Sequence, residues 1–356
     1  MKLGIAIDPS LKKIQIPLEK IQLAESLGFD AIWAAEAYGT DAITPLAFIA
    51  AHTKKIRLGT SIAQVSARTP AATAMAFNTL DQLAGDGRAI CGLGLSGPQV
   101  IEGWHGQAWD LPYHRMKDTV AIIKRILQRD APVEYQGKAY SLPYCQADSV
   151  DGMAAANPRF GKPLKSIAAT NADLPILLAT GSESMVKLTA EISDGWIPFG
   201  FAPGDMAAYQ PWLEQGFARA TANGQPAKDL STFEIYAPCV VCLTDDVKAA
   251  IQQQKSAVAF YVGGMGHQQK NFHKDRMARA GYQAEAEKIQ QLFLEGQREA
   301  AVDIVPDEFV DNAALIGSKE RIVERLKHWQ SSGATGLILN GADKSLMKLI
   351  ADYFQG

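Results

Sequence analysis

Two titratable side chains stand where a predicted structural element ends, and both could act as a general acid or base. Glu36 directly follows the apolar run 31–35, which places it at the carboxyl end of a strand, where α/β enzymes assemble their active sites. His105 lies in the segment Gly103-Trp104-His105-Gly106, and an imidazole titrates near neutral pH. A solvated loop acid or helix cap would also account for Glu36, and a lone loop histidine is more often structural. Both are candidate catalytic residues.

The segment Ala179-Thr180-Gly181-Ser182 joins an apolar strand to a helix. Gly181 permits a tight turn, Ser182 is a preferred N-cap residue, and exposed amides at such a helix start attract anions. The four residues therefore form a candidate phosphate site. Ordinary helix capping is the alternative, and the carboxylate of Glu183 would repel a phosphate if its side chain turned inward.

Three basic residues, Arg159, Lys162 and Lys165, lie in the loop that leads to the same strand. Charge clusters are usually solvated faces. Because these residues precede the candidate phosphate site, the alternative is that they bind the tail of an anionic cofactor.

The run Gly92-Leu93-Gly94-Leu95-Ser96-Gly97 follows a predicted strand and fits the glycine pattern of dinucleotide-binding folds. The acidic residue about 20 positions further on would be Asp118, but Asp118 falls inside a predicted helix that starts near Pro112 instead of ending a second strand. This strand and its following loop also form the fourth unit along the chain, instead of opening a βαβ fold. A barrel strand that ends in a glycine-rich loop is favoured over a Rossmann site.

The cysteine and histidine positions do not indicate a metal centre. Cys239 and Cys242 have the spacing of a redox or zinc motif. They lie in a predicted strand, however, where residues three apart point to opposite faces, so core packing is favoured. The six histidines show no metal-ligand spacing, and we find no Ser/His/Asp elbow, Walker loop or His-Glu-x-x-His motif.

Composition narrows the class of partner. The 356 residues carry 35 basic and 38 acidic side chains, a net charge of −3, and 47% are hydrophobic. This balance argues against a nucleic-acid-binding face and favours a folded protein that binds small molecules. No apolar stretch is long enough for a membrane helix and the N-terminus does not resemble a signal peptide, so we expect a cytoplasmic protein without a membrane partner.

Strand-like and helix-like patterns alternate along the chain. Helical stripes recur between apolar strand runs, and in the helix after Pro112 the residues Met116, Val120, Ile123 and Leu127 form one buried stripe. A hairpin is predicted at 133–142, and 245–311 is helical without strand signals. We predict a single-domain (β/α)8 TIM barrel over 1–356, with a helical insertion before the last unit. Its eight strands are 3–8, 31–35, 56–62, 88–93, 174–179, 195–198, 231–243 and 334–339.

Several short segments, in their order and spacing, resemble the bacterial luciferase-like superfamily, in particular its branch of oxidoreductases that use the deazaflavin coenzyme F420. The resemblance spans almost the whole chain and thins at 148–160 and in the insertion. The segments that carry it are 33–39 (WAAEAYG) with Asp41-Ala42, 56–62 (IRLGTSI), 68–71 (RTPA), Gly87-Arg88, 92–94 (GLG), 96–100 (SGPQV), 102–106 (EGWHG) and 194–196 (DGW).

The resemblance implies a barrel whose carboxyl-end mouth holds a flavin or deazaflavin. By the same resemblance, Ser61 and Ile62 would be joined by a non-prolyl cis peptide and, with Ala63, would lie against the tricyclic ring. Ser96 and Gly97 would approach the ring or ribityl chain, and the segment 179–182 would receive the phosphate. Relatives that oxidise alcohols or sugar phosphates often have a histidine after the acidic residue at the second strand's end, whereas this chain has Ala37.

The function favoured by these patterns is hydride transfer between F420 and a small organic substrate. The closest alternative is an FMN-dependent monooxygenase of the same superfamily that works with a separate flavin reductase. F420 carries a long polyanionic tail and FMN does not, so the basic cluster at 159–165 favours F420. A nicotinamide dehydrogenase and a non-catalytic barrel are the alternatives from other classes. A homodimer is expected by family analogy, and the substrate is not identified.

Overall fold

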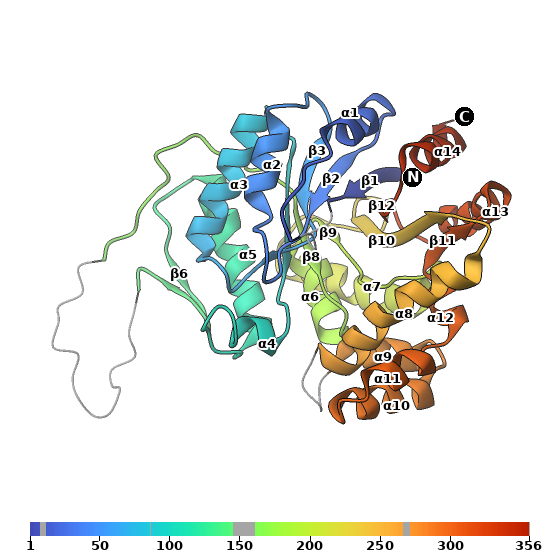
Figure 1. Ribbon diagram of the computed structural model, residues 1–356. Coiled ribbons are helices and arrows are strands. Elements are labelled where there is room, and N and C mark those ends of the chain that lie inside the picture. Colours follow the sequence, from blue (N-terminus) through green and yellow to red (C-terminus); the bar gives the residue numbers. More distant parts are fainter. Residues whose placement is uncertain (8–11, 86, 145–160, 266–270, 356) are drawn as a thin grey trace.

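The computed structural model describes residues 1–7, 12–85, 87–144, 161–265 and 271–355 (Figure 1). No described helix is long and apolar enough to cross a membrane. The basic residue Arg159 and most of the loop expected at 148–165 lie outside the described residues.

Eight parallel strands close into a barrel, which confirms the predicted fold class. Each strand pairs with the next, β9 also pairs with β10, and β12 pairs with β1 to complete the ring. A closed ring excludes the open sheet of a Rossmann fold. The barrel strands are β1 (Lys2–Ala6), β2 (Ala31–Ala34), β3 (Arg57–Thr60), β5 (Ala89–Gly94), β8 (Ile176–Ala179), β9 (Gly195–Trp196), β10 (Glu234–Leu243) and β12 (Gly336–Asn340).

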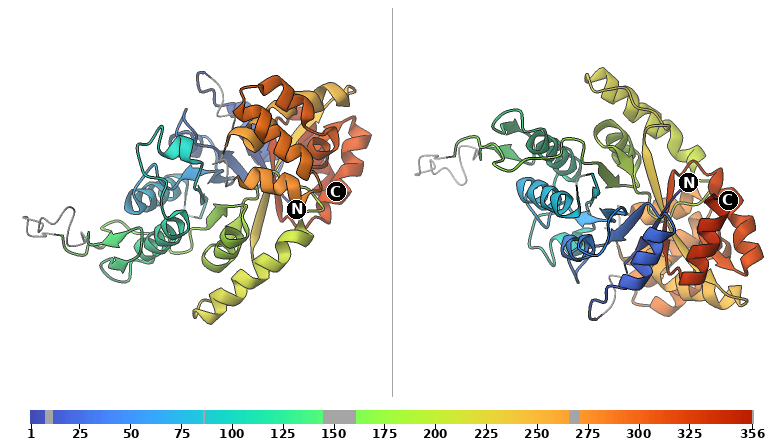
Figure 2. Two further views of the ribbon diagram at one scale, coloured as in Figure 1. Left: turned by 90° about the horizontal axis from the view of Figure 1, so that it is seen from below. Right: turned by 90° about the horizontal axis from the view of Figure 1, so that it is seen from above.

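Helices pack around the outside of the barrel (Figure 1). The stripe predicted in α5 is buried, with Met116, Val120, Ile123 and Leu127 at most 2% exposed. In both views of Figure 2, helix α7 projects from the barrel and the two chain ends lie side by side. The helices outside the insertion are α1 (Leu18–Ser26), α2 (Ile43–Ala50), α3 (Pro70–Ala84), α4 (Pro98–Ile101), α5 (Pro112–Gln128), α6 (Glu183–Ile192), α7 (Met206–Ala222), α13 (Lys319–Gln330) and α14 (Lys344–Gln355).

Helices α8 to α12 occupy the segment in which a helical insertion was predicted. They share a second hydrophobic core, separate from the core between the barrel and its helices, and lie together on one side of the barrel (Figure 2). Their bounds are α8 (Val247–Gly264), α9 (Phe272–Arg279), α10 (Gln283–Leu294), α11 (Arg298–Ile304) and α12 (Asp307–Asn312).

Four short strands complete the fold. The hairpin predicted at 133–142 is present as β6 (Tyr135–Gln136) and β7 (Ser141–Leu142), and β4 (Ala63–Gln64) extends the edge of β5. Strand β11 (Ala314–Gly317), which the sequence pattern did not predict, pairs with the carboxyl-terminal half of β10. Periodicity cannot identify a four-residue, fully buried strand between two helices.

Large side chains fill the barrel interior. Trp33 lies between β1 and β3, where a Cβ at either Gly4 or Gly59 would come within 2.6 Å of its indole ring. Its ring centroid is 4.9 Å from that of Tyr236 on β10. Glycine at both neighbouring positions therefore makes room for the indole.

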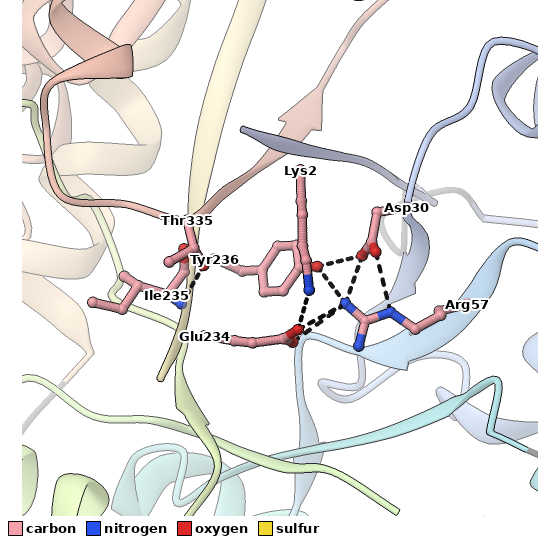
Figure 3. Close-up of polar contacts among 7 residues, drawn as sticks. All are labelled: Lys2, Asp30, Arg57, Glu234, Ile235, Tyr236 and Thr335. Carbon is pink, nitrogen blue, oxygen red and sulfur yellow. Dashed lines mark hydrogen bonds and ion pairs between the residues drawn. The ribbon is translucent and has the colours of Figure 1, made fainter. Parts of the chain in front are cut away.

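A network of ion pairs closes the amino end of the barrel (Figure 3). Arg57 donates to Asp30 at 2.8 Å, to Glu234 at 3.1 Å and to the Tyr236 hydroxyl at 2.6 Å. Tyr236 also donates to Asp30, and Lys2 pairs with Glu234. Burial raises the pKa of Tyr236. Burial alone would lower the pKa of Arg57, but the interactions with Tyr236, Asp30 and Glu234 are stronger and raise it. Both groups therefore keep their protons at neutral pH.

Candidate functional site

The carboxyl ends of adjacent strands bring the predicted site segments together. Residue pairs such as Ala34 with Thr60 and Gly94 with Ala179 are in register, so the segments that follow β2, β3, β5 and β8 line one rim of the barrel. The peptide bond between Ser61 and Ile62 is cis, as the resemblance implies. The rim thus holds Glu36, Ser61 to Ala63, Ser96, Gly97 and Ala179 to Ser182.

Glu36 is held in an ion pair that the sequence did not reveal. Its carboxylate accepts bonds from both Arg68 terminal nitrogens at 2.8 Å and from the backbone N–H of Gln64 at 3.0 Å. Its backbone N–H donates to Ile62, also at 3.0 Å. The bond to Glu36 raises the pKa of Arg68. Only 7% of the Glu36 side chain is exposed. Through these bonds, Glu36 positions the segment 62–68. Its direct part in proton transfer stays a prediction.

Gln64 is a site residue that sequence reasoning missed. Its side chain is 2% exposed, and neither its amide nitrogen nor its amide oxygen has a partner among the described residues. Ala63 and Val65 on either side belong to the core outside the barrel, so strand alternation turns Gln64 toward the interior. Leaving a buried amide unpaired costs about 1–3 kcal/mol, which indicates a group that bonds to a ligand. A polar residue two positions after Ile62 was the available signal.

The loop after β5 carries Ser96, Gly97 and His105. Ser96 has a positive φ of 54°, a left-handed conformation that re-aims the chain into the short helix α4. The Nε2 atom of His105 is buried and has no hydrogen-bond partner among the described residues. The predicted catalytic role of His105 stays open, and its free ring nitrogen is compatible with it.

The candidate phosphate segment lies at the start of α6, and its role as a phosphate site stays a prediction. Ser182 is the N-cap of α6, but its side chain makes no capping hydrogen bond, and Thr180 bonds to Thr189 at 2.8 Å. Glu183 pairs with Lys187 on the helix surface. A Cβ at Gly181 would lie 2.8 Å from the ring of Phe272 in the insertion. Gly181 therefore lets the insertion approach the rim closely.

Lys165, one of the basic residues expected beside this segment, lies at the other end of the barrel. Lys165 donates to the backbone oxygen of Asp130, just beyond the end of α5, and Arg129 donates to Ser166. Lys162 is exposed. A loop that leads into a strand ends at the amino end of that strand, whereas the phosphate segment follows its carboxyl end. The expectation that Lys165 holds an anionic tail beside Ser182 is wrong.

Aromatic side chains of the insertion cover part of the rim. The ring of Phe199, which follows β9, lies 4.5 Å from Tyr261 and 4.7 Å from His273. Burial lowers the pKa of His273 to about 3, so its imidazole is neutral at physiological pH. Gln99 donates to the backbone oxygen of Gly264 at 3.0 Å and connects the loop after β5 to the end of α8. The insertion thus forms an uncharged wall over one side of the mouth.

The remaining alternatives from the sequence are structural features. Asp118 lies inside α5 and accepts bonds from the Tyr135 hydroxyl and from the backbone N–H groups of Ala139 and Tyr140, so it anchors the hairpin. Cys239 and Cys242 face different hydrophobic cores. The described residues contain no group of three or more potential metal ligands.

Comparisons with known proteins agree with this architecture. The model of the luciferase-like monooxygenase family matches residues 9–336. A Mycobacterium tuberculosis protein named "Putative coenzyme F420-dependent oxidoreductase Rv3520c" is 38% identical over 352 residues, which is 99% of this chain and 98% of the relative.

Two solved structures show the same fold. The coenzyme F420-dependent tetrahydromethanopterin reductase of Methanopyrus kandleri has a TM-score of 0.74 at 23% identity, with 99% of this chain and 97% of that chain covered. The oxygenating constituent of 3,6-diketocamphane monooxygenase of Pseudomonas putida, in complex with FMN, has a TM-score of 0.63 at 18% identity, again with 99% and 97% covered.

The fold and the rim define the class as oxidoreductases built on a (β/α)8 barrel. Within that class, the chain belongs to the luciferase-like monooxygenase family.

Proposed function

We propose that this protein transfers hydride between coenzyme F420 and a small organic substrate. The observation that carries the proposal is the 38% identity, over nearly the full length of both chains, to a relative whose name refers to F420. The two solved structures are less than 25% identical and support only the fold.

The rim fits a tricyclic ring that carries polar edges. Gln64 offers a buried amide donor and acceptor, and His105 offers a buried ring nitrogen, none of them bonded to the described protein. The imide edge of a deazaflavin presents the complementary donors and acceptors. Close contact of Gly181 with Phe272 places the insertion directly beside the segment proposed for the phosphate.

Each group of rim residues has a distinct task in this proposal. Ser61, Ile62 and Ala63 support the ring on one side, while Ser96 and Gly97 approach it from the loop after β5. Glu36 and Arg68 fix the backbone between 62 and 68. When bound, F420 supplies or accepts the hydride. The protein's task is therefore positioning.

The aromatic wall keeps water from the reacting atoms. Phe199 and Tyr261 contribute apolar rings, and His273 stays uncharged because burial keeps its pKa low. A dry, preorganised site strengthens the polar contacts made inside it. An uncharged wall also favours a neutral part of the substrate at this side of the mouth.

Titration with F420 and with FMN, followed by fluorescence and absorbance, tests the proposal. We expect saturable binding of F420 and weak or no binding of FMN. Tighter binding of FMN, together with oxygen consumption when a flavin reductase is supplied, would instead establish the monooxygenase. No change with either chromophore would contradict both.

A further inference from the structure

A cavity of about 700 Å³ lies outside the barrel, between the insertion and the first turn of α7. Asp205, Ala207 and Ala208 of that turn line one side. Helix α9 contributes Arg276 and Arg279, and four further charged or titratable side chains line the remainder: Tyr282, Glu308, Arg325 and His328.

Positive groups in this cavity are incompletely neutralised. Arg279 has no carboxylate partner among the described residues and lies over the rings of Tyr209 and Trp212, at 5.7 and 5.4 Å from their centroids. Arg276 has 13% of its side chain exposed and reaches Asp205 only at 3.4 Å, and its Nε atom is buried without a partner. At the cavity wall, the Arg279 guanidinium therefore offers a positive charge without a carboxylate partner among the described residues, which fits an anionic ligand.

The acidic side chains of the wall already have partners. Asp205 accepts from the backbone N–H of Ala202 at 2.9 Å and faces Arg276, and Glu308 bonds to the Tyr282 hydroxyl. Arg325 is bound to Asp311 at 3.1 Å. The Arg279 guanidinium donates to the Tyr209 hydroxyl at 3.3 Å and keeps further donors for a ligand. The positive end of the 17-residue helix α7 faces the same space.

Helix α9 connects this cavity to the candidate phosphate segment. Phe272 packs on Gly181 at its start, and Arg276 and Arg279 follow four and seven residues later, positions that share one helix face. Arg276 also lies under Gly200, where an added Cβ would come within 2.9 Å of the guanidinium. Helix α9 therefore begins at the rim beside Gly181 and reaches the cavity at Arg276 and Arg279.

We propose that this cavity binds the polyanionic tail of the deazaflavin cofactor, with Arg276 and Arg279 as the contacts for its phosphate and carboxylate groups. The proposal rests on the proposed function. In this proposal the insertion binds the anionic tail, which the sequence pattern had assigned to the basic cluster at 159–165.

The test compares F420 with the same deazaflavin chromophore lacking the phosphate and the tail. Dissociation constants are measured by fluorescence titration for the wild type, for Arg279→Glu and for the matched control Lys165→Glu at the opposite end of the barrel. We expect Arg279→Glu to weaken F420 binding about tenfold or more and to reduce its salt dependence. Binding of the tail-less chromophore should change less than twofold, and Lys165→Glu should bind both like the wild type.

Each other outcome overturns the inference in a recognisable way. If the wild type binds both chromophores and Arg279→Glu alters neither, the tail does not use the cavity while the proposed function stands. Equal weakening by Lys165→Glu would reveal a general charge effect. If the wild type binds neither chromophore, the proposed function and the inference fail together. Unfolding curves of the variants ensure that a loss of binding is not a loss of fold.

Discussion

The two ends of the barrel differ in whether their buried polar groups are bonded to other groups of the protein. At the amino end, the charged groups of Arg57, Asp30 and Glu234 are bonded to one another or to Tyr236 (Figure 3). At the carboxyl end, the amide of Gln64 and the Nε2 of His105 are buried and have no hydrogen-bond partner in the described part of the chain.

This difference indicates that the polar groups at one end stabilise the fold and that those at the other end are available to bind a ligand. A satisfied network stabilises the fold and leaves nothing for a ligand, whereas each unpaired buried group costs free energy that a ligand can recover. In barrel enzymes the carboxyl end carries the active site. Substitutions in the bonded network at the amino end should therefore change the free energy of unfolding, and substitutions of the unpaired groups at the carboxyl end should change binding.

The largest effect is expected for Arg57→Ala at the amino end. Removing the guanidinium leaves Asp30 and Glu234, each only about one-fifth exposed, without their main partner, so the free energy of unfolding should fall by about 2–4 kcal/mol. Urea unfolding measures this change. Lys2→Ala, at the exposed edge of the same network, should cost less than about 1 kcal/mol. A loss of F420 affinity in folded Arg57→Ala would break the comparison.

Arg68→Met, in the ion pair with Glu36 at the carboxyl end, should have the next largest effect on the free energy of unfolding. It leaves the carboxylate of Glu36, 7% exposed, without its ion-pair partner, at a cost of about 1–3 kcal/mol. A double-mutant cycle with Glu36→Gln, by urea unfolding, should give a coupling energy of at least about 1 kcal/mol. Additive losses would show that the two side chains do not act as a pair.

The buried imidazole of His273 predicts a pH dependence of stability. Its pKa in the folded protein is about 3, against an ordinary value of 6.5, so only the unfolded chain takes up this proton between these values. The free energy of unfolding should therefore fall below about pH 6.5, with this group contributing about 2 kcal/mol at pH 5. His273→Phe should abolish that part of the loss in urea unfolding at pH 7 and pH 5. The exposed His52→Phe serves as the control and should leave the loss intact.

Gln64→Leu should have the smallest effect on stability and a selective effect on binding. Because the amide has no hydrogen-bond partner among the described residues, an apolar side chain of similar size should leave the free energy of unfolding unchanged or slightly higher. F420 affinity should fall about tenfold, which corresponds to one lost hydrogen bond of about 1.4 kcal/mol. Gln210→Leu, on the exposed face of α7, is the matched control. Lower stability with unchanged affinity would mean that Gln64 serves the fold.

Most of the architecture could be predicted from local patterns in the sequence. The stripe from Met116 to Leu127 and the opposite faces of Cys239 and Cys242 follow from the periods of helix and strand, and both are as predicted. The eight-unit alternation was sufficient to predict a closed barrel. The same local reasoning misplaced Lys165, because nearness in sequence to a strand does not say at which end of the strand a loop lies.

The sequence by itself determined the order of strands and helices, the buried face of each and the family, because these depend on neighbours a few residues apart. Only the tertiary structure decided that Arg68 neutralises Glu36, that the Gln64 amide finds no partner among the residues described, and that Arg276 lines a cavity beside α7. Each of these contacts joins residues 28 or more positions apart or depends on how the insertion packs. Their geometry is set by the closure of the barrel, and no pattern along the chain records it.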